Sequence, residues 1–267
     1  MKNRLNNESF TKATKRFVPY MMSSDPSPEV SVDIALTLQE AGVEALEWGV
    51  PFSDPLADGP VIQEAGQRAL KRGGSLSKAL STMTEARKQG LTIPAVLFTY
   101  VNPVLSFGFE KLVQEMGEAG FDGLLIPDLP YEESHSYREY CRKHEISLIP
   151  LVAPSSRSRV EKICKDADGF VYYVTSLGVT GTRQNFSESL KAEIEIVKSF
   201  SHVPVLAGFG ISTPEHVAFF QKIADGAIVG SALVRKIGSL EEDLLDPEKK
   251  TSALNEIKAF VQELISY

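Results

Sequence analysis

The feature that most constrains the fold is the alternation of short apolar runs with amphipathic segments along nearly the whole chain. The runs are almost continuously apolar, as in parallel strands that are buried on both faces. The segments between them carry helix signals: Pro214 follows Ser212 or Thr213 as an N-cap, and Gly226 comes after the end. The predicted strands are residues 17–22, 45–50, 94–100, 123–128, 147–153, 169–175, 204–210 and 226–230.

Eight strands alternating with helices predict an α/β fold of one domain, a single (β/α)8 barrel over residues 1–267. A chain of this length with 43% hydrophobic residues suits one such barrel. We expect an extra polar helix before the first strand, a last helix near 251–265, and a short helix after the eighth strand. The alternative, a six-stranded doubly wound sheet, leaves two strands over and lacks the GxGxxG turn.

The charge and composition of the chain indicate which kinds of binding partner to expect. The net charge is −7 with both signs mixed along the chain, so we expect no nucleic acid, which needs a basic stripe. The sequence has no apolar run of membrane-spanning length and no apolar segment of a signal peptide. Cys141 and Cys164 suggest no disulfide framework. We expect a soluble cytoplasmic protein that does not bind membranes.

Two carboxylates lie where a barrel carries its chemistry, at the C-terminal ends of strands and in the loops that follow. Glu47 lies in the second predicted strand, and Asp58 lies in the Asp/Pro-rich loop after it. A buried glutamate could be a structural ion-pair partner, but burial beside Trp48 would raise its pKa and suit it to proton transfer. Two carboxylates in different environments can divide acid and base roles. Asp54 is at least as well explained as a turn-stabilising residue.

Glycines follow the last three predicted strands and indicate a phosphate site. Gly178 and Gly181 follow the sixth strand, Gly210 ends the seventh, and Gly230-Ser231 follows the eighth. Glycine lets the backbone approach a ligand closely, and a helix opened by Gly230-Ser231 would turn free N–H groups toward an anion. The alternative is that these glycines merely serve tight turns, but their joint placement favours the phosphate site.

Several other kinds of catalytic site need residues that this sequence does not have at the expected positions. A Schiff-base aldolase needs a lysine on a barrel strand, and none of the predicted strands has one. The four histidines lie away from the catalytic face, so we expect no metal site. What remains is acid–base chemistry on a phosphorylated small molecule.

The stretch "LEWGVPFSDPLADGPVIQ" closely resembles the signature of the tryptophan synthase alpha subunit family. The motifs "FVPYMM", "FTYVNP", "PDLP", "GVTGTR", "GFGIS" and "GSALV" follow in that family's order and spacing, over nearly the whole chain. The resemblance implies a (β/α)8 barrel that cleaves indole-3-glycerol phosphate to indole and glyceraldehyde 3-phosphate for tryptophan biosynthesis. It also implies an α2β2 assembly with a beta subunit that receives the indole, and pyridoxal phosphate in that subunit only.

The resemblance also assigns residues. It implies Glu47 and Asp58 as the catalytic pair. The substrate-binding residues that it implies are Phe98, Tyr100, Asp128, Tyr172, Thr180, Gly181, Gly210, Gly230 and Ser231. In this reading Thr180 lies in a mobile loop that engages Asp128 on closing. Two positions depart from the family pattern: Ser24 stands where a glycine is common, and Leu177 occupies a position of variable size.

Three other readings remain open. A related phosphate-binding barrel, such as phosphoribosylanthranilate isomerase or indole-glycerol phosphate synthase, is one, although the synthase needs a lysine in the barrel mouth. A stand-alone lyase that releases free indole is the second. A catalytically silent subunit is the third, and the presence of Glu47 and Asp58 argues against it.

Overall fold

The computed structural model describes residues 3–156, 158–175, 188–208 and 210–266. Its centre is one sheet in which every pair of neighbouring strands is parallel. The strands are β1 Arg16–Met22, β2 Leu46–Gly49, β3 Ala95–Phe98, β4 Gly123–Leu125, β5 Ser147–Leu148, β6 Leu151–Val152, β7 Val171–Val174, β8 Val205–Gly208 and β9 Gly226–Val229.

The sheet curls into a barrel. Its strand order is β5-β4-β3-β2-β1-β9-β8-β7-β6, so the two end strands, β5 and β6, are consecutive in the chain. They are the two halves of the single strand predicted at 147–153. The residues between them still join both neighbours: Ile149 N–H donates to Leu124 O at 2.8 Å, and Pro150 O accepts from Tyr172 N–H at 2.9 Å. Pro150 has no N–H to donate, which accounts for the break in the strand.

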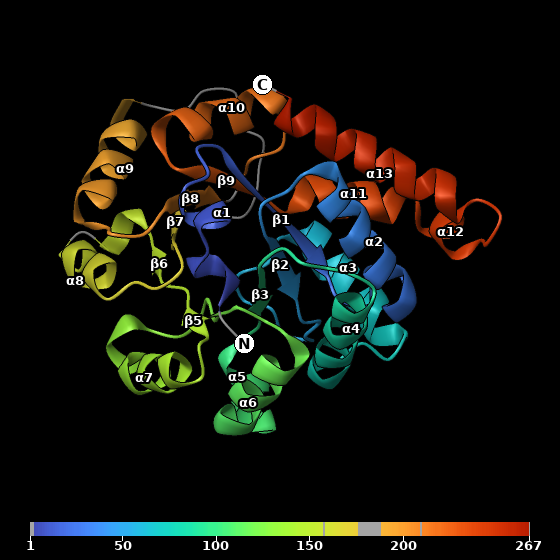
Figure 1. Ribbon diagram of the computed structural model, residues 1–267, viewed down its shortest axis with the longest axis horizontal. Coiled ribbons are helices and arrows are strands. Elements are labelled where there is room, and N and C mark those ends of the chain that lie inside the picture. The colour runs from blue at the N-terminus through green and yellow to red at the C-terminus, as the bar shows by residue number, and fades with distance from the viewer. Residues whose placement is uncertain (1–2, 157, 176–187, 209, 267) are drawn as a thin grey trace.

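Helices surround the sheet on its outer side, except α1 (Glu8–Thr11), which lies across one end of the barrel (Figure 1). They are α1 Glu8–Thr11, α2 Pro28–Ala41, α3 Pro60–Lys71, α4 Leu76–Lys88, α5 Val101–Phe107, α6 Phe109–Ala119, α7 His135–Lys143, α8 Val160–Lys165, α9 Glu188–Phe200, α10 Pro214–Ile223, α11 Ser231–Ser239, α12 Glu241–Leu245 and α13 Lys250–Ile265. Short 3-10 turns are η1 Arg4–Asn6, η2 Tyr131–Glu133 and η3 Pro154–Ser156. Among the described residues, no helix combines the length and the apolar character needed to cross a membrane.

Local signals in the sequence account for several helix ends. Ser27 caps α2 by accepting a hydrogen bond from Val30 N–H, and Gly42 ends that helix with a φ of 94°. Of the two predicted caps for α10, Thr213 is the one used: its side chain accepts from His216 N–H. The predicted helix before the first strand is the short pair η1 and α1, and the predicted last helix is α13.

The apolar residues form two layers because successive side chains of a strand point to opposite faces. Val18, Tyr20 and Met22 of β1 belong to the cluster inside the barrel, with Phe98, Leu206 and Ile228 from other strands. Phe17 and Met21 of the same strand belong to the cluster between sheet and helices. In a barrel of this type the interior is a packed core, so a ligand site must lie at one end.

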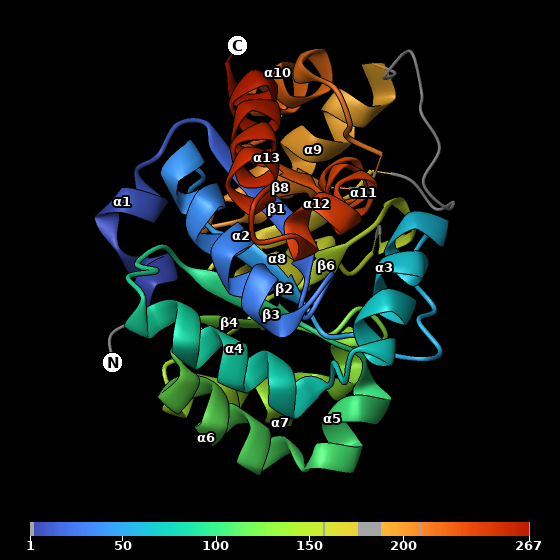
Figure 2. The same cartoon turned by 90° about the vertical axis from the view of Figure 1, so that its right-hand side faces the viewer.

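The N-terminal segment covers one end of the barrel. In Figure 2, α1 lies at the left side of the molecule and α3 at the right. Leu5 and Phe10 are buried in the cluster inside the barrel, so the segment fills this end with apolar side chains. We call this the closed end; the other, onto which the C-terminal ends of the strands open, is the mouth.

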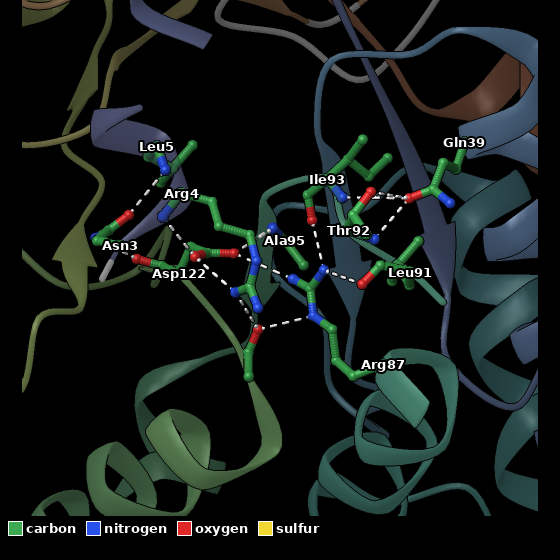
Figure 3. Close-up of polar contacts among 11 residues, drawn as sticks. Asn3, Arg4, Leu5, Gln39, Arg87, Leu91, Thr92, Ile93, Ala95 and Asp122 are labelled. Atoms are coloured by element: carbon green, nitrogen blue, oxygen red, sulfur yellow. Dashed lines mark hydrogen bonds and ion pairs between the residues drawn. The ribbon is translucent and has the colours of Figure 1, made fainter. Parts of the chain in front are cut away.

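A buried carboxylate ties the closed end together (Figure 3). Asp122 Oδ1 accepts from Arg4 N–H at 2.8 Å and from the Arg4 guanidinium at 3.0 Å. Asp122 Oδ2 accepts from Ala95 N–H at 2.9 Å and from the Arg87 guanidinium at 3.1 Å. Asn3 extends the network by donating to the carbonyl of Asp122 and to the Ser147 hydroxyl. Every oxygen of this buried charge therefore has partners, which is the condition for a buried ion pair to be tolerated.

Candidate active site

A cavity of about 260 Å³ opens at the mouth of the barrel. Its wall comes from strands, from the loops after them and from the first turns of α3 and α11. The lining residues are Tyr20, Glu47, Ala57, Asp58, Gly59, Pro60, Val61, Ile62, Phe98, Tyr172, Gly210, Ile211, Ser212, Ile228, Gly230, Ser231, Ala232 and Arg235. Both predicted catalytic carboxylates thus lie on one cavity, although Asp58 is eleven positions beyond Glu47 in the sequence.

Glu47 is a carboxyl group in an apolar setting. It lies in the middle of β2, beside Tyr20 of β1 in the strand register, and is 1% exposed. Its Oε1 makes no hydrogen bond with any residue that the structure describes. Because burial disfavours the charged form, the pKa of Glu47 is raised to about 8. The alternative of a structural ion pair has no support here, since no described cation lies in salt-bridge contact with Glu47.

Asp58 is the second carboxyl group of the cavity, in a more polar setting. It is 9% exposed and directly precedes Gly59, the N-cap of α3. Burial raises the pKa of Asp58 to about 6, and a hydrogen bond with the Tyr100 hydroxyl opposes that rise. The same hydroxyl accepts from Ala57 N–H at 3.2 Å, so Tyr100 holds the loop at the residue before Asp58. The two carboxyl groups therefore differ in pKa, as a division of acid and base roles requires.

Two tyrosines form the deep part of the cavity. Tyr20 and Tyr172 come from β1 and β7, and each ring lies over a glycine of the next strand. A Cβ at Gly49 would overlap the Tyr20 hydroxyl, and a Cβ at Gly208 would overlap that of Tyr172. Phe98 packs edge-on against Tyr20, with ring centroids 5.5 Å apart. These rings give an aromatic substrate an apolar surface beside the carboxyl groups.

The other side of the cavity offers backbone donors. Gly230 is the N-cap of α11 and Ser231 its first residue, and no side chain caps this end. The first N–H groups of α11 therefore have no partner within the helix and attract negative charge. Gly210 adopts a φ of 76°, a conformation that favours glycine, whereas Gly230 has a φ of −106° and could hold a Cβ at ordinary contact distances. The phosphate-site reading of Gly210, Gly230 and Ser231 thus has a suitable geometry.

A model of the tryptophan synthase alpha chain family matches residues 7–266 of this sequence. The chain belongs to that family. It is 51% identical over 250 residues to the tryptophan synthase alpha chain of Halalkalibacterium halodurans, with 94% of each chain covered. It is 50% identical over 246 residues to that of Bacillus subtilis, with 92% of each covered.

Solved structures agree. The tryptophan synthase subunit alpha of Legionella pneumophila superposes with a TM-score of 0.85 at 34% identity, covering 98% of this chain and 99% of that one. A chain of Mycobacterium tuberculosis tryptophan synthase does so with a TM-score of 0.85 at 32% identity, covering 100% and 98%. The predictions of a (β/α)8 barrel and of a lyase that cleaves indole-3-glycerol phosphate for tryptophan biosynthesis are therefore confirmed.

Not every residue that the alpha-chain resemblance implied lies on the cavity wall. Tyr100 lies behind the wall and acts on it through Asp58 and Ala57. Asp128, predicted to end the fourth strand, lies in a turn beyond the end of β4, and its Oδ1 accepts from Val101 N–H at 2.9 Å. Asp54 is exposed and bonded to the Ser53 hydroxyl, as a turn residue would be. Gly178, Thr180 and Gly181, like Leu177, lie outside the described residues.

Ser24, where the alpha-chain family commonly has glycine, has an unfavourable conformation. Its φ is 66°, in the left-handed region that favours glycine, and its Oγ is buried without a hydrogen bond to any described residue. The departure from the family pattern therefore falls at a position where the backbone explains the family's choice.

The sequence analysis did not assign several of the cavity residues, among them Tyr20, Ser212 and Arg235. Ser212 was considered only as a helix cap, yet it lines the cavity and its buried Oγ makes no hydrogen bond within the described part of the chain. Arg235 was not considered at all. Its one signal in the sequence is its position four residues after Ser231, on the same face of the predicted short helix.

Proposed function

We propose that Glu47 and Asp58 carry out the cleavage of indole-3-glycerol phosphate without a cofactor in this chain. The observation that carries the proposal is Glu47 itself: a buried carboxyl group at the cavity whose pKa of about 8 keeps it protonated at neutral pH. A group in this state can first donate a proton and then, as a carboxylate, accept one.

Glu47 would transfer two protons in turn during this cleavage. Glu47 donates its proton to C3 of the indole ring, and the ring becomes an indolenine cation. The Glu47 carboxylate then removes the proton of the hydroxyl group on the adjoining glycerol carbon, so that a C=O bond forms and the C3–carbon bond breaks. The bonding electrons return to the ring and neutralise the cation. Indole and glyceraldehyde 3-phosphate result, and Glu47 is protonated again.

Asp58 has an electrostatic role in this proposal. As a carboxylate it accepts a hydrogen bond from the ring N–H and stabilises the cation as charge develops there. Its pKa of about 6 leaves it ionised at neutral pH, whereas Glu47 stays protonated. Phe98 and Tyr172 would lie against the indole and glycerol parts, and Gly210, Gly230 and Ser231 would bind the phosphate. Thr180, Gly181 and Asp128 remain proposals that rest on the resemblance alone.

A pH profile tests this division of roles. The reactive form needs Asp58 ionised and Glu47 protonated, so kcat/KM for indole release should be bell-shaped, with limbs near pH 6 and pH 8. Asp58→Asn should lose the acidic limb because Asn cannot titrate. A flat profile between pH 5 and 9 in the unaltered chain would contradict the assignment.

The proposed partner is a tryptophan synthase beta subunit in an α2β2 assembly, with pyridoxal phosphate in that subunit and the cytoplasm as the compartment. One relative in the comparison, from Pyrococcus furiosus, is described as a tryptophan synthase complex. Two large apolar side chains are exposed in this chain after neighbouring strands: Leu56 is 85% exposed in the loop that carries Asp58, and Leu105 of α5 is 59% exposed. A protein surface that covered them would also order the catalytic loop.

Indole release, measured with and without a beta subunit, separates the two lyase readings. Binding should raise turnover by more than about 10-fold if only the closed fraction of the loop is competent in the isolated chain. Stimulation below about twofold would support the stand-alone lyase.

A further inference from the structure

Arg235 lies at the phosphate side of the cavity. It is four residues beyond Ser231 in α11, and residues at this spacing share one face of a helix. Helical side chains lean toward the N-terminus of their helix, a direction that for Arg235 leads toward the first turn of α11, where Gly230 and Ser231 line the same cavity. Arg235 is also among the residues that line the cavity.

Arg235 is unpaired among the residues that the structure describes. The described part of the chain offers it no ion pair and no hydrogen bond, although the neighbouring Lys236 is paired with Glu256 at 2.8 Å. Other arginines around α3 and α11 are engaged: Arg68, for example, forms two hydrogen bonds of 2.8 Å with Asp25. A cation without a partner at the rim of a cavity is available to a ligand.

The charge balance of the cavity favours an anion at this place. The cavity wall has two carboxyl groups, those of Glu47 and Asp58. Among the described residues of the wall, Arg235 is the one arginine or lysine. A phosphate dianion held by backbone N–H groups alone would face these acids without a countercharge. Ser212 lies on the same cavity with a buried hydroxyl oxygen that has no described partner, and this independently indicates a missing hydrogen-bonding group.

We propose that Arg235 binds the phosphate group of the substrate and is the side chain that selects phosphorylated over unphosphorylated substrate. A guanidinium forms paired hydrogen bonds with phosphate oxygens and is always charged. The backbone donors of α11 position the anion, and Arg235 supplies the charge. This inference rests on the proposed function, because it concerns the same cavity.

The test compares Arg235→Met with Lys236→Met, a matched control that removes one charge from the next residue of the same helix. Inorganic phosphate binding, measured by calorimetry, should weaken about 10-fold or more in Arg235→Met and less than about twofold in Lys236→Met. The KM for indole-3-glycerol phosphate should rise by a similar factor with kcat within about twofold, because the phosphate is remote from the bond that breaks. Turnover of indole glycerol, which lacks the phosphate, should differ by less than about twofold between Arg235→Met and the unaltered chain.

Arg235→Lys keeps the charge and should retain part of the affinity for phosphate, which separates a charge contact from a packing effect. Equal losses in Arg235→Met and Lys236→Met, an equal loss for indole glycerol, or no phosphate binding by the unaltered chain would each overturn the proposal. Calorimetry with phosphate needs no turnover. If the unaltered chain failed to release indole, the proposed function would fall while the phosphate measurement still decided the role of Arg235.

Discussion

Two buried carboxylates at opposite ends of the barrel have opposite surroundings. Asp122 at the closed end is 2% exposed and accepts four hydrogen bonds, two of them from arginine guanidinium groups and two from backbone N–H groups. Glu47 at the mouth is 1% exposed, and its Oε1 accepts none from the described residues. Burial is the same, so the difference lies in the partners: both oxygens of the first group are hydrogen-bonded, whereas the second has an oxygen that no described residue bonds.

The contrast extends to neighbouring groups. Ser24 lies two residues after β1, Thr99 directly follows β3, and Ser212 lies in the loop after β8. Each has a buried hydroxyl without a hydrogen bond in the described part of the chain. The polar side chains that meet at the closed end, Asn3, Arg4, Arg87 and Ser147, all contact Asp122 or one another. The carboxylate network at the closed end is therefore fully bonded, whereas the unmet hydrogen-bonding capacity of these hydroxyls lies at the mouth, where a ligand can use it.

The largest expected effect is on catalysis at the mouth. Glu47→Gln keeps the size of the side chain but removes the proton, so turnover in an indole-release assay should fall by about 10²- to 10⁴-fold. Asp122→Asn, far from the cavity, should change turnover of the folded protein by less than about threefold. Near-native turnover of Glu47→Gln would remove Glu47 from the mechanism.

The second effect is on stability at the closed end. Asp122→Asn should lower the free energy of unfolding by about 3 kcal/mol, because the two arginines lose a buried countercharge. Denaturant unfolding would measure it. The control is Asp168→Asn, which breaks the more exposed pair with Arg142 and should cost less than about 1 kcal/mol. If both variants lost the same amount, the closed end would not be the stabilising region that the contacts indicate.

The third prediction concerns the pH dependence of stability. The folded pKa of Glu47 is raised to about 8, so the group is neutral in both states at low pH. As pH rises from the usual glutamate range toward 8, the unfolded chain ionises while the folded chain keeps its proton, and stability is lost. Glu47→Gln should therefore show a smaller loss between pH 5 and pH 9, by at least about 1 kcal/mol. Parallel pH profiles for the two proteins would mean that the pKa of Glu47 is not raised.

The smallest effect is at Ser24. Ser24→Gly removes a side chain from a left-handed position and a buried hydroxyl without a partner, so it should stabilise the protein by about 1 kcal/mol in thermal or denaturant unfolding. Ser24→Ala removes the hydroxyl but keeps a Cβ at the left-handed position, so it separates the two contributions and should stabilise the protein less than Ser24→Gly. A destabilised Ser24→Gly would show that the hydroxyl contributes to the native loop.

The barrel was predictable because its signals are local. Continuous apolar runs identified the strands, and serine or threonine caps with following prolines located helix starts such as that of α10. Two predicted strand boundaries were wrong, and the cause in each case is also local. Pro150 split one strand into β5 and β6, and the fourth strand ended at Leu125, three residues before Asp128. Apolar composition does not reveal where hydrogen bonding between strands stops.

The sequence by itself determined the alternation of elements, the family, and the carboxylate pair Glu47 and Asp58, because each depends on residue types at short spacing. Only the tertiary structure decided which polar residues meet. At the closed end it placed Asn3 and Arg87 in hydrogen-bonding contact with Asp122. At the mouth it placed Arg235 and Ser212 on the same cavity as Glu47. The physical reason is that burial and hydrogen-bond partners are properties of packed elements distant in sequence. A buried carboxyl group can therefore be fully hydrogen-bonded in one place and lack hydrogen bonds from the described residues in another.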